Sequence, residues 1–235
     1  MNSPGQNRAL LFAAEEASKH PEWSEYVLYC RAREKGLRKE AFAHLDTFIA
    51  STGQWPEELK RDFATCLLTW CETLMDADYG PFPGALKEKV IKPVMEKWCD
   101  EETASSAPFR WYGIHFNSPA HLEKALTLNP LDDRARIAVI TSLAEKLGHS
   151  VHHLPDSYIG DPEEDMKCCA IAEDHIRKLS EPILKRYWEK ELKGISELIG
   201  NYLEWKASGH GNLAVWGREQ GKRVDSGVKA YYYER

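Results

Sequence analysis

The chain has 235 residues, of which 43% are hydrophobic and 29% charged, and its formal net charge is −6. This balance excludes a disordered chain and suits a globular protein, long enough for one large helical domain or two small ones. Because no block of like charge dominates, the sequence predicts no extended nucleic-acid surface. Its mildly acidic character favours a basic protein partner.

No stretch of the sequence is apolar enough to span a bilayer, which predicts no membrane association. The apolar run at residues 9–14 is too short for a secretory signal, and Glu15 and Glu16 follow it at once. We therefore expect a cytoplasmic protein. Its six cysteines are irregularly spaced, as expected for reduced core thiols, although the adjacent Cys168 and Cys169 suggest redox chemistry or a soft metal as an alternative.

Proline and glycine signals divide the chain into helices. Proline at the first helical position loses no hydrogen bond, because the N–H of that position has no partner within the helix. Glycine just beyond a helix supplies the left-handed conformation that ends it. The proline signals are Ser3-Pro4, His20-Pro21, Trp55-Pro56, Ser118-Pro119 and Asp161-Pro162, and the glycine signals are Gly36, Gly53, Gly148 and Gly209.

Between these signals, apolar residues recur at helical spacing and no alternating pattern predicts a sheet. The longest apolar stripe runs from Leu184 to Tyr202, and another contains Pro93, which is expected to kink or break its helix. We expect an all-α fold of stacked helical hairpins, either a repeat-like solenoid or an irregular bundle. Residues 1–209 are expected to form a single domain, and residues 210–235 an irregular segment that packs on this domain or binds a partner.

Residues 35–49 predict one such hairpin in detail. A helix ends near Lys35, Gly36 makes the turn, and the second helix places Ala41, Leu45 and Phe48 on one face. A small residue near the helix crossing and larger ones further along allow two helices to pack closely.

The segment 22–49 resembles the tetratricopeptide repeat through Leu28, Gly36, Ala41 and Leu45, although Tyr29 and Phe48 stand where that family prefers smaller residues. Residues 121–130 are similar to the second helix of the repeat and its closing Asn-Pro. The helix expected before them is missing or replaced by residues 109–113. The resemblance implies stacked hairpins with a concave surface that holds peptides or protein partners, and therefore binding rather than catalysis.

The segment 148–161 holds three of the nine histidines and is the best candidate for chemistry. His149 and His152 could meet on one helical turn, and Asp156 or Asp161 could add an oxygen ligand, a set that zinc or iron accepts. The alternative is a polar loop whose histidines interact with the negative end of the preceding helix. No His-Glu-x-x-His or Cys-x-x-Cys motif supports a metal, so we predict no metal and no cofactor.

No nucleophile with a neighbouring base is evident, so we expect a protein-binding helical scaffold, specifically a bacterial immunity or adaptor protein that holds or inhibits its partner. The alternative function is a metal-dependent enzyme that uses residues 149–161. Self-association through Tyr231, Tyr232 and Tyr233 is a further alternative. Aromatic residues outside the apolar stripes are candidate partner anchors. The expected partner-binding residues are Trp111, Tyr112, His149, His152, His153, Tyr158, Asp161 and Trp216.

Overall fold

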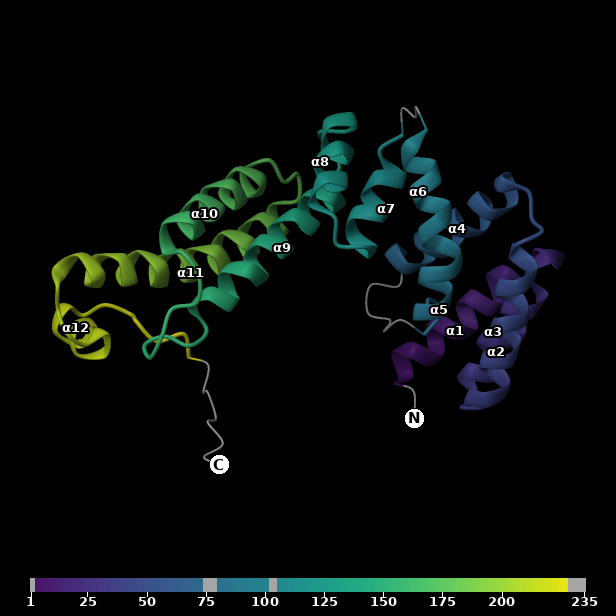
Figure 1. Ribbon diagram of the computed structural model, residues 1–235, viewed down its shortest axis with the longest axis horizontal. Helices are drawn as coiled ribbons and strands as arrows, with labels where there is room; N and C mark the ends of the chain where they lie inside the picture. Colours follow the sequence, from purple (N-terminus) through teal and green to yellow (C-terminus); the bar gives the residue numbers. More distant parts are fainter. Residues whose placement is uncertain (1–2, 74–79, 102–104, 228–235) are drawn as a thin grey trace. The chain divides into compact units, whose positions relative to one another are not determined.

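The computed structural model describes residues 3–73, 80–101 and 105–227, and within these ranges all regular structure is helical (Figure 1). The predicted all-α class is therefore confirmed. Contacts divide the chain into two compact units, residues 1–104 and 105–235, and this division falls inside the segment 1–209 that the sequence suggested as one domain. Among the described helices, none combines the length and hydropathy of a bilayer-spanning segment. The tyrosines at 231–233 lie outside the described residues.

The N-terminal unit begins with helices whose starts follow the proline signals. Ser3 caps the first helix by accepting a hydrogen bond from the Gln6 backbone at 3.2 Å, and the Gln6 side chain accepts one from Ser3 in return. Pro4 and Pro21 each stand at the start of a helical segment, as predicted. The helices of this unit are α1 (Pro4–Ala17), η1 (Pro21–Trp23), α2 (Ser24–Glu34), α3 (Arg38–Thr52), α4 (Glu57–Thr73), α5 (Gly84–Leu86), η2 (Lys87–Ile91) and α6 (Lys92–Asp100).

The expected hairpin around Gly36 is formed by α2 and α3. Gly36 adopts φ 77°, a left-handed conformation that favours glycine, and it joins the two helices in a tight turn. Ala41, Leu45 and Phe48 are fully buried on the inner face of α3. The hairpin therefore packs through the residues that the sequence pattern selected.

Aromatic rings fill the core of the N-terminal unit. Phe63 of α4 lies 5.1 Å from Trp23, 5.2 Å from Tyr26 and 4.9 Å from Phe48, measured between ring centroids. Edge-to-face and tilted pairs at such distances each add about 0.5–1.5 kcal/mol beyond the area they bury. The hydroxyl of Tyr26 donates to the Pro81 carbonyl at 2.6 Å, so the buried phenol keeps a partner.

Pro93 neither breaks its helix nor leaves it regular. Its ring nitrogen cannot donate to a carbonyl in the preceding turn. The chain responds with the π-helical turn η2, residues Lys87–Ile91, which leads directly into α6. The helical path from residue 84 to residue 100 is continuous, so of the two predicted outcomes, a kink or a break, the break does not occur.

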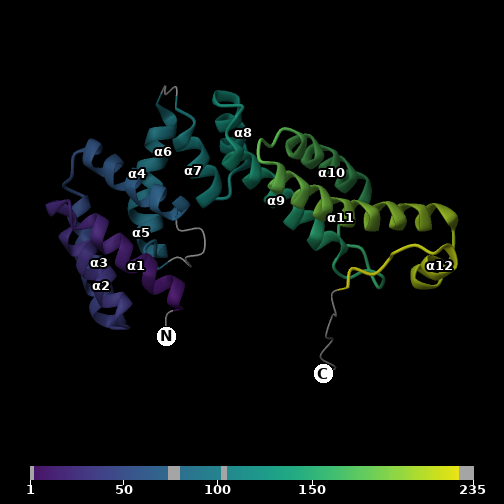
Figure 2. The same ribbon diagram turned by 180° about the vertical axis from the view of Figure 1, so that it is seen from behind.

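The C-terminal unit contains a helical hairpin, a group of three packed helices and a closing helix. Helices α10 and α11 lie side by side over α9, as Figures 1 and 2 show. Pro119 and Pro162 start helices as predicted. The helices of this unit are α7 (Ala107–His115), α8 (Pro119–Leu128), α9 (Asp133–Val151), α10 (Pro162–Arg177), α11 (Pro182–Ser208) and α12 (Leu213–Gln220).

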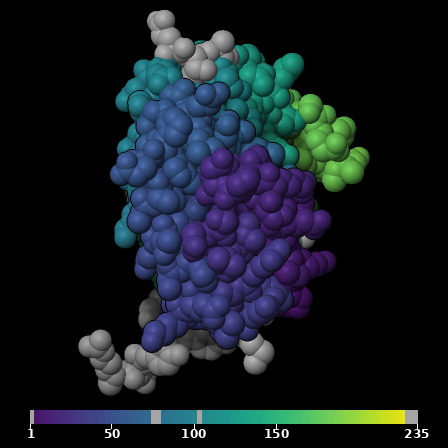
Figure 3. Space-filling model, turned by 90° about the vertical axis from the view of Figure 1, so that its right-hand side faces the viewer, coloured from purple at the N-terminus to yellow at the C-terminus, as the bar shows by residue number. Residues whose placement is uncertain are grey.

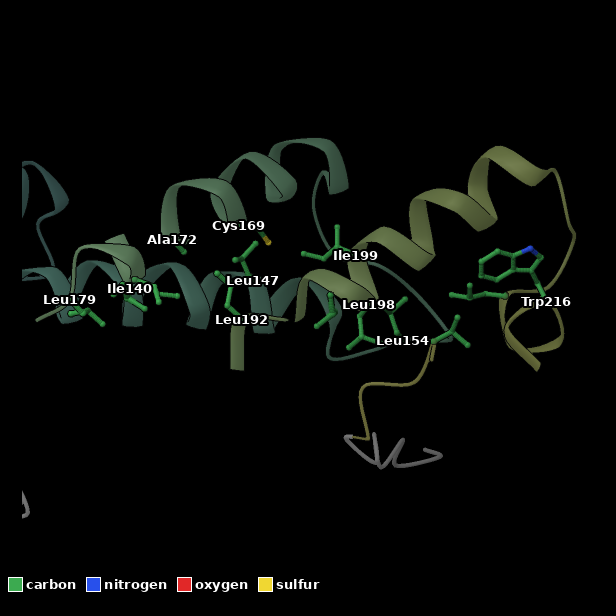
Figure 4. Close-up of a cluster of buried hydrophobic side chains, with 14 residues drawn as sticks. Ile140, Leu147, Leu154, Cys169, Ala172, Leu179, Leu192, Leu198, Ile199 and Trp216 are labelled. Carbon is green, nitrogen blue, oxygen red and sulfur yellow. The ribbon is translucent and has the colours of Figure 1, made fainter. Parts of the chain in front are cut away.

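A chain of buried aliphatic side chains runs through this unit (Figure 4). The core extends from Ile140 and Leu147 of α9, across Ala172 of α10 and Leu192 of α11, to Trp216 of α12. Helix α12 lies within the segment expected to be irregular. Asn212 caps its start and Gly221, in the left-handed conformation, ends it.

Helix α7 fills the position where the sequence indicated a missing helix before residues 121–130. A Cβ atom on Gly113 would lie 2.6 Å from Cγ and Cδ2 of Leu122, so the glycine permits α8 to approach α7 closely. A short helix containing Pro108 and Gly113 has weak intrinsic propensity, which explains why the sequence pattern concealed it.

Candidate functional site

The three histidines of segment 148–161 gather where α9 ends. The rings of His149 and His152 stack with centroids 4.8 Å apart, and those of His152 and His153 lie 3.8 Å apart. Nδ1 of His152 lies 2.5 Å from the carbonyl of His149, within the last turn of the helix. This arrangement matches the alternative in which the imidazoles interact with the helix C-terminus.

The same segment gives a metal ion no set of ligands. Among the residues that the structure describes, no group of three or more His, Cys, Asp or Glu side chains is arranged to hold a metal. The carboxylate of Asp161 instead caps α10 by accepting from the backbone N–H groups of Glu163 at 2.9 Å and Glu164 at 3.3 Å. No specific observation therefore supports the metal-dependent alternative.

Tyr158 belongs to a polar cluster that the sequence did not indicate. Its hydroxyl donates to Oδ2 of buried Asp165 at 2.8 Å, and Lys146 of α9 lies 3.6 Å from Oδ1 of the same carboxylate. Burial raises the pKa of Tyr158, and the bond to Asp165 raises it further. Asp165 follows Tyr158 by seven residues and lies on a different helix from Lys146, so no local sequence motif could have revealed this cluster.

The adjacent cysteines face different surroundings. Cys169 is buried, and burial raises the pKa of its thiol to about 11, which makes it a poor nucleophile at neutral pH. Cys168 is partly exposed and accepts a hydrogen bond from Lys146 at 3.2 Å. The two side chains diverge, as expected for neighbours on a helix.

The predicted aromatic anchors lie inside the C-terminal unit. Trp111 and Trp216 are each 6% exposed, and Trp216 is part of the aliphatic core. The ring centroid of Tyr112 lies 4.2 Å from that of His121 on α8 and 4.8 Å from that of Phe116. Trp111 and Trp216 are therefore largely covered within the chain, whereas Tyr112 is half-buried.

A groove of about 670 Å³ lies between α8, the α8–α9 turn and α10. Leu126, Pro130 and Leu131 line its apolar part. Its polar part includes buried Arg136, whose guanidinium donates to the Pro130 carbonyl but leaves Nε without a hydrogen bond. His175 lines it too, and burial, followed by the charge of Arg136, lowers its pKa.

Exposed apolar side chains gather at the same end of the unit. Leu131 is 84% exposed, Ile183 is 68% exposed and Tyr187 is 53% exposed, and Leu184 is also exposed. The backbone N–H of Ser180 donates to Asp133 at 3.0 Å, which brings the start of α11 to the α8–α9 turn. We call Leu131, Ile183, Leu184 and Tyr187 the apolar edge. The sequence assigned Leu184 to a buried stripe, but the first two turns of α11 are largely exposed.

Comparisons with protein-family models, with curated proteins and with solved structures found no match to this chain.

Proposed function

We propose that the chain is a helical scaffold that binds another protein through the apolar edge and the groove beside it. The observation that carries this proposal is the concentration of large exposed apolar side chains at one end of the C-terminal unit. Exposed apolar side chains scattered singly need no explanation, whereas a group of them beside a groove marks a surface that a partner covers.

The geometry favours a protein over a small molecule. The apolar edge continues along α11 beyond the groove, from Ile183 to Tyr187, and therefore offers more surface than a compact ligand covers. Leu131 projects from the rim of the groove, and Tyr187 presents an aromatic ring, a residue type enriched among the side chains that dominate interface energetics. The apolar edge thus supplies side chains that can anchor a partner protein, and the groove supplies a recess that can receive side chains of that partner.

The role within this proposal is that of an immunity or adaptor protein, which blocks or holds its partner by binding alone. The resemblance of residues 22–49 to the tetratricopeptide repeat supports binding in the same general sense. The net charge of −6 favours a basic partner, whose association would weaken as salt rises.

A capture experiment tests the proposal. The full chain, immobilised and exposed to lysate of its source cell, is compared with an Ile183→Gln/Tyr187→Gln variant, and bound proteins are quantified by mass spectrometry. We expect one abundant partner on the wild-type chain and a loss of at least roughly tenfold on the variant, because each removed anchor costs more than about 1 kcal/mol.

The matched control is Val215→Gln, which replaces another exposed apolar side chain of the same unit, on α12. Its capture should equal that of the wild type. Equal loss in both variants, or a wild-type chain that captures nothing, would contradict the proposal.

A further inference from the structure

The turn between α2 and α3 carries an unusual concentration of positive charge. Five of the nine residues from 31 to 39 are Lys or Arg, although acidic residues outnumber basic ones in the N-terminal unit. Figure 3 shows the surface of this unit on the side of α1, α2 and α3. Arg31, Lys35, Arg38 and Lys39 are all exposed.

These four cations make no ion pair with any side chain of residues 3–73, 80–101 or 105–227. Other cations of the same unit do find acidic partners. Lys19 lies 2.6 Å from Glu16, Lys60 lies 3.0 Å from Glu57, and Arg61 pairs with Glu101. The charge of these four residues is therefore not balanced by an ion pair among the described residues.

The stability of the helices does not explain the placement of all four cations. Arg31 lies in the last turn of α2, where the helix dipole favours positive charge. Arg38 and Lys39 begin α3, where the dipole disfavours it. The guanidinium of Arg38 lies 5.7 Å from the ring centroid of Phe42, whereas Lys39 has no such contact with a ring among the described residues. Lys39 thus occupies a position that costs stability.

Two leucines accompany the charges. Leu37 lies between Lys35 and Arg38 in the turn, and Leu28 precedes Arg31 by three residues on α2, which places the two on one face. Both leucine side chains are exposed. The surface therefore combines cations with exposed apolar groups over a short span, and Glu34 and Glu40 lie within it.

We propose that the α2–α3 turn is a docking surface for a short acidic segment of a partner protein that carries apolar side chains among its carboxylates. Charge complementarity selects the carboxylates, and Leu28 and Leu37 receive the apolar groups. The short span favours such a segment over a nucleic acid, because a long polyanion would continue onto the acidic remainder of the unit. This surface shares no residue with the apolar edge, so it gives the scaffold a second contact of different chemistry.

The test measures binding by fluorescence anisotropy to the full chain. The probe is a short labelled peptide of Glu, Asp and Leu, and its neutral counterpart contains Gln and Asn in place of the acids. We expect the acidic peptide to bind, the neutral one to bind at least roughly tenfold more weakly, and Arg38→Glu/Lys39→Glu to cause a similar loss. The matched control is Arg8→Glu/Lys89→Glu, which reverses two exposed cations of the same unit that also lack ion pairs, and it should retain binding within about twofold.

Thermal unfolding of Lys39→Glu separates a binding role from a structural one. An acid in the first turn of α3 should leave the Tm equal to or above that of the wild type while peptide binding falls. A Tm several degrees lower would show that Lys39 serves the fold and would overturn the proposal. Absence of peptide binding, or equal losses in the control variant, would also overturn it. Tighter binding of duplex DNA or of phosphatidylserine vesicles, with the same dependence on Arg38 and Lys39, would replace the protein segment with that ligand.

Discussion

Asp161 shows how a single residue of the candidate site also serves the fold. The sequence placed it both at a helix start and among the partner-binding residues, and the structure shows its carboxylate capping α10. We expect Asp161→Ala to lower the free energy of unfolding by about 1 kcal/mol, because two N–H groups lose their acceptor. Urea denaturation measures this change. Asp156→Ala, an exposed aspartate of the same loop, is the control and should change the free energy by less than about 0.5 kcal/mol.

His175 makes stability depend on pH. Burial and Arg136 lower its pKa in the folded chain below the ordinary value of about 6.5, and Lys178 acts in the same direction, whereas Asp174 and Glu123 oppose it. Between the lowered pKa of the folded chain and the ordinary pKa of the unfolded chain, the unfolded chain binds the proton more readily. The contribution of neutral His175 to the free energy of unfolding is therefore present at neutral pH and is lost as the pH falls.

His175→Gln should therefore lose less stability than the wild type between neutral pH and about pH 5.5, as measured by denaturation midpoints. Parallel declines in the two proteins would contradict this assignment. The sequence alone could not predict the effect, since Arg136 lies on a different helix, far from His175 along the chain.

At the level of helices, two of the glycines that lie inside helices, Gly113 of α7 and Gly148 of α9, have opposite surroundings. A Cβ on Gly113 would collide with Leu122, whereas nothing lies within 4 Å of a Cβ on Gly148. We expect Gly113→Ala to destabilise the chain by about 1–3 kcal/mol through overpacking. Gly148→Ala should stabilise it by up to about 1 kcal/mol through helix propensity. Chemical denaturation of both variants checks the pair, and a stabilised Gly113→Ala would contradict the packing of α7 on α8.

The positions of the helices could largely be predicted from the sequence, whereas the burial of their side chains by other helices could not. Proline starts, the left-handed glycines Gly36 and Gly209 and the buried stripe of α3 depend on local rules, and the structure follows them. The other two glycine signals were wrong in part, because Gly148 lies inside α9 and Gly53 follows α3 in a right-handed conformation. Leu184 fits the same periodicity but is exposed, because its burial depends on which helices extend alongside it. Trp111 and Trp216 lie outside the apolar stripes of the sequence, and yet both side chains are buried.

For the whole molecule, the described core of the C-terminal unit draws only on residues after 105 and reaches Trp216 and Val224. We expect a fragment of residues 105–235 to unfold cooperatively and to retain its helical circular dichroism. A chain that ends at residue 209 should be less stable than the full chain, because it loses the cover that α12 gives to the core. Equal stability of the truncated and full chains would contradict this packing. The boundary near residue 104 falls in residues 101–108, EETASSAP, whose small and polar residues and proline are typical of a loop. Composition alone does not distinguish a loop between two units from a loop within one, so the sequence did not reveal the boundary.

Hydrogen–deuterium exchange of the full chain, alone and with its captured partner, tests the binding account most directly. We expect slower exchange at residues 128–133 and in the first two turns of α11, where the apolar edge lies. Exchange that slows only in other segments, such as α12, would contradict it.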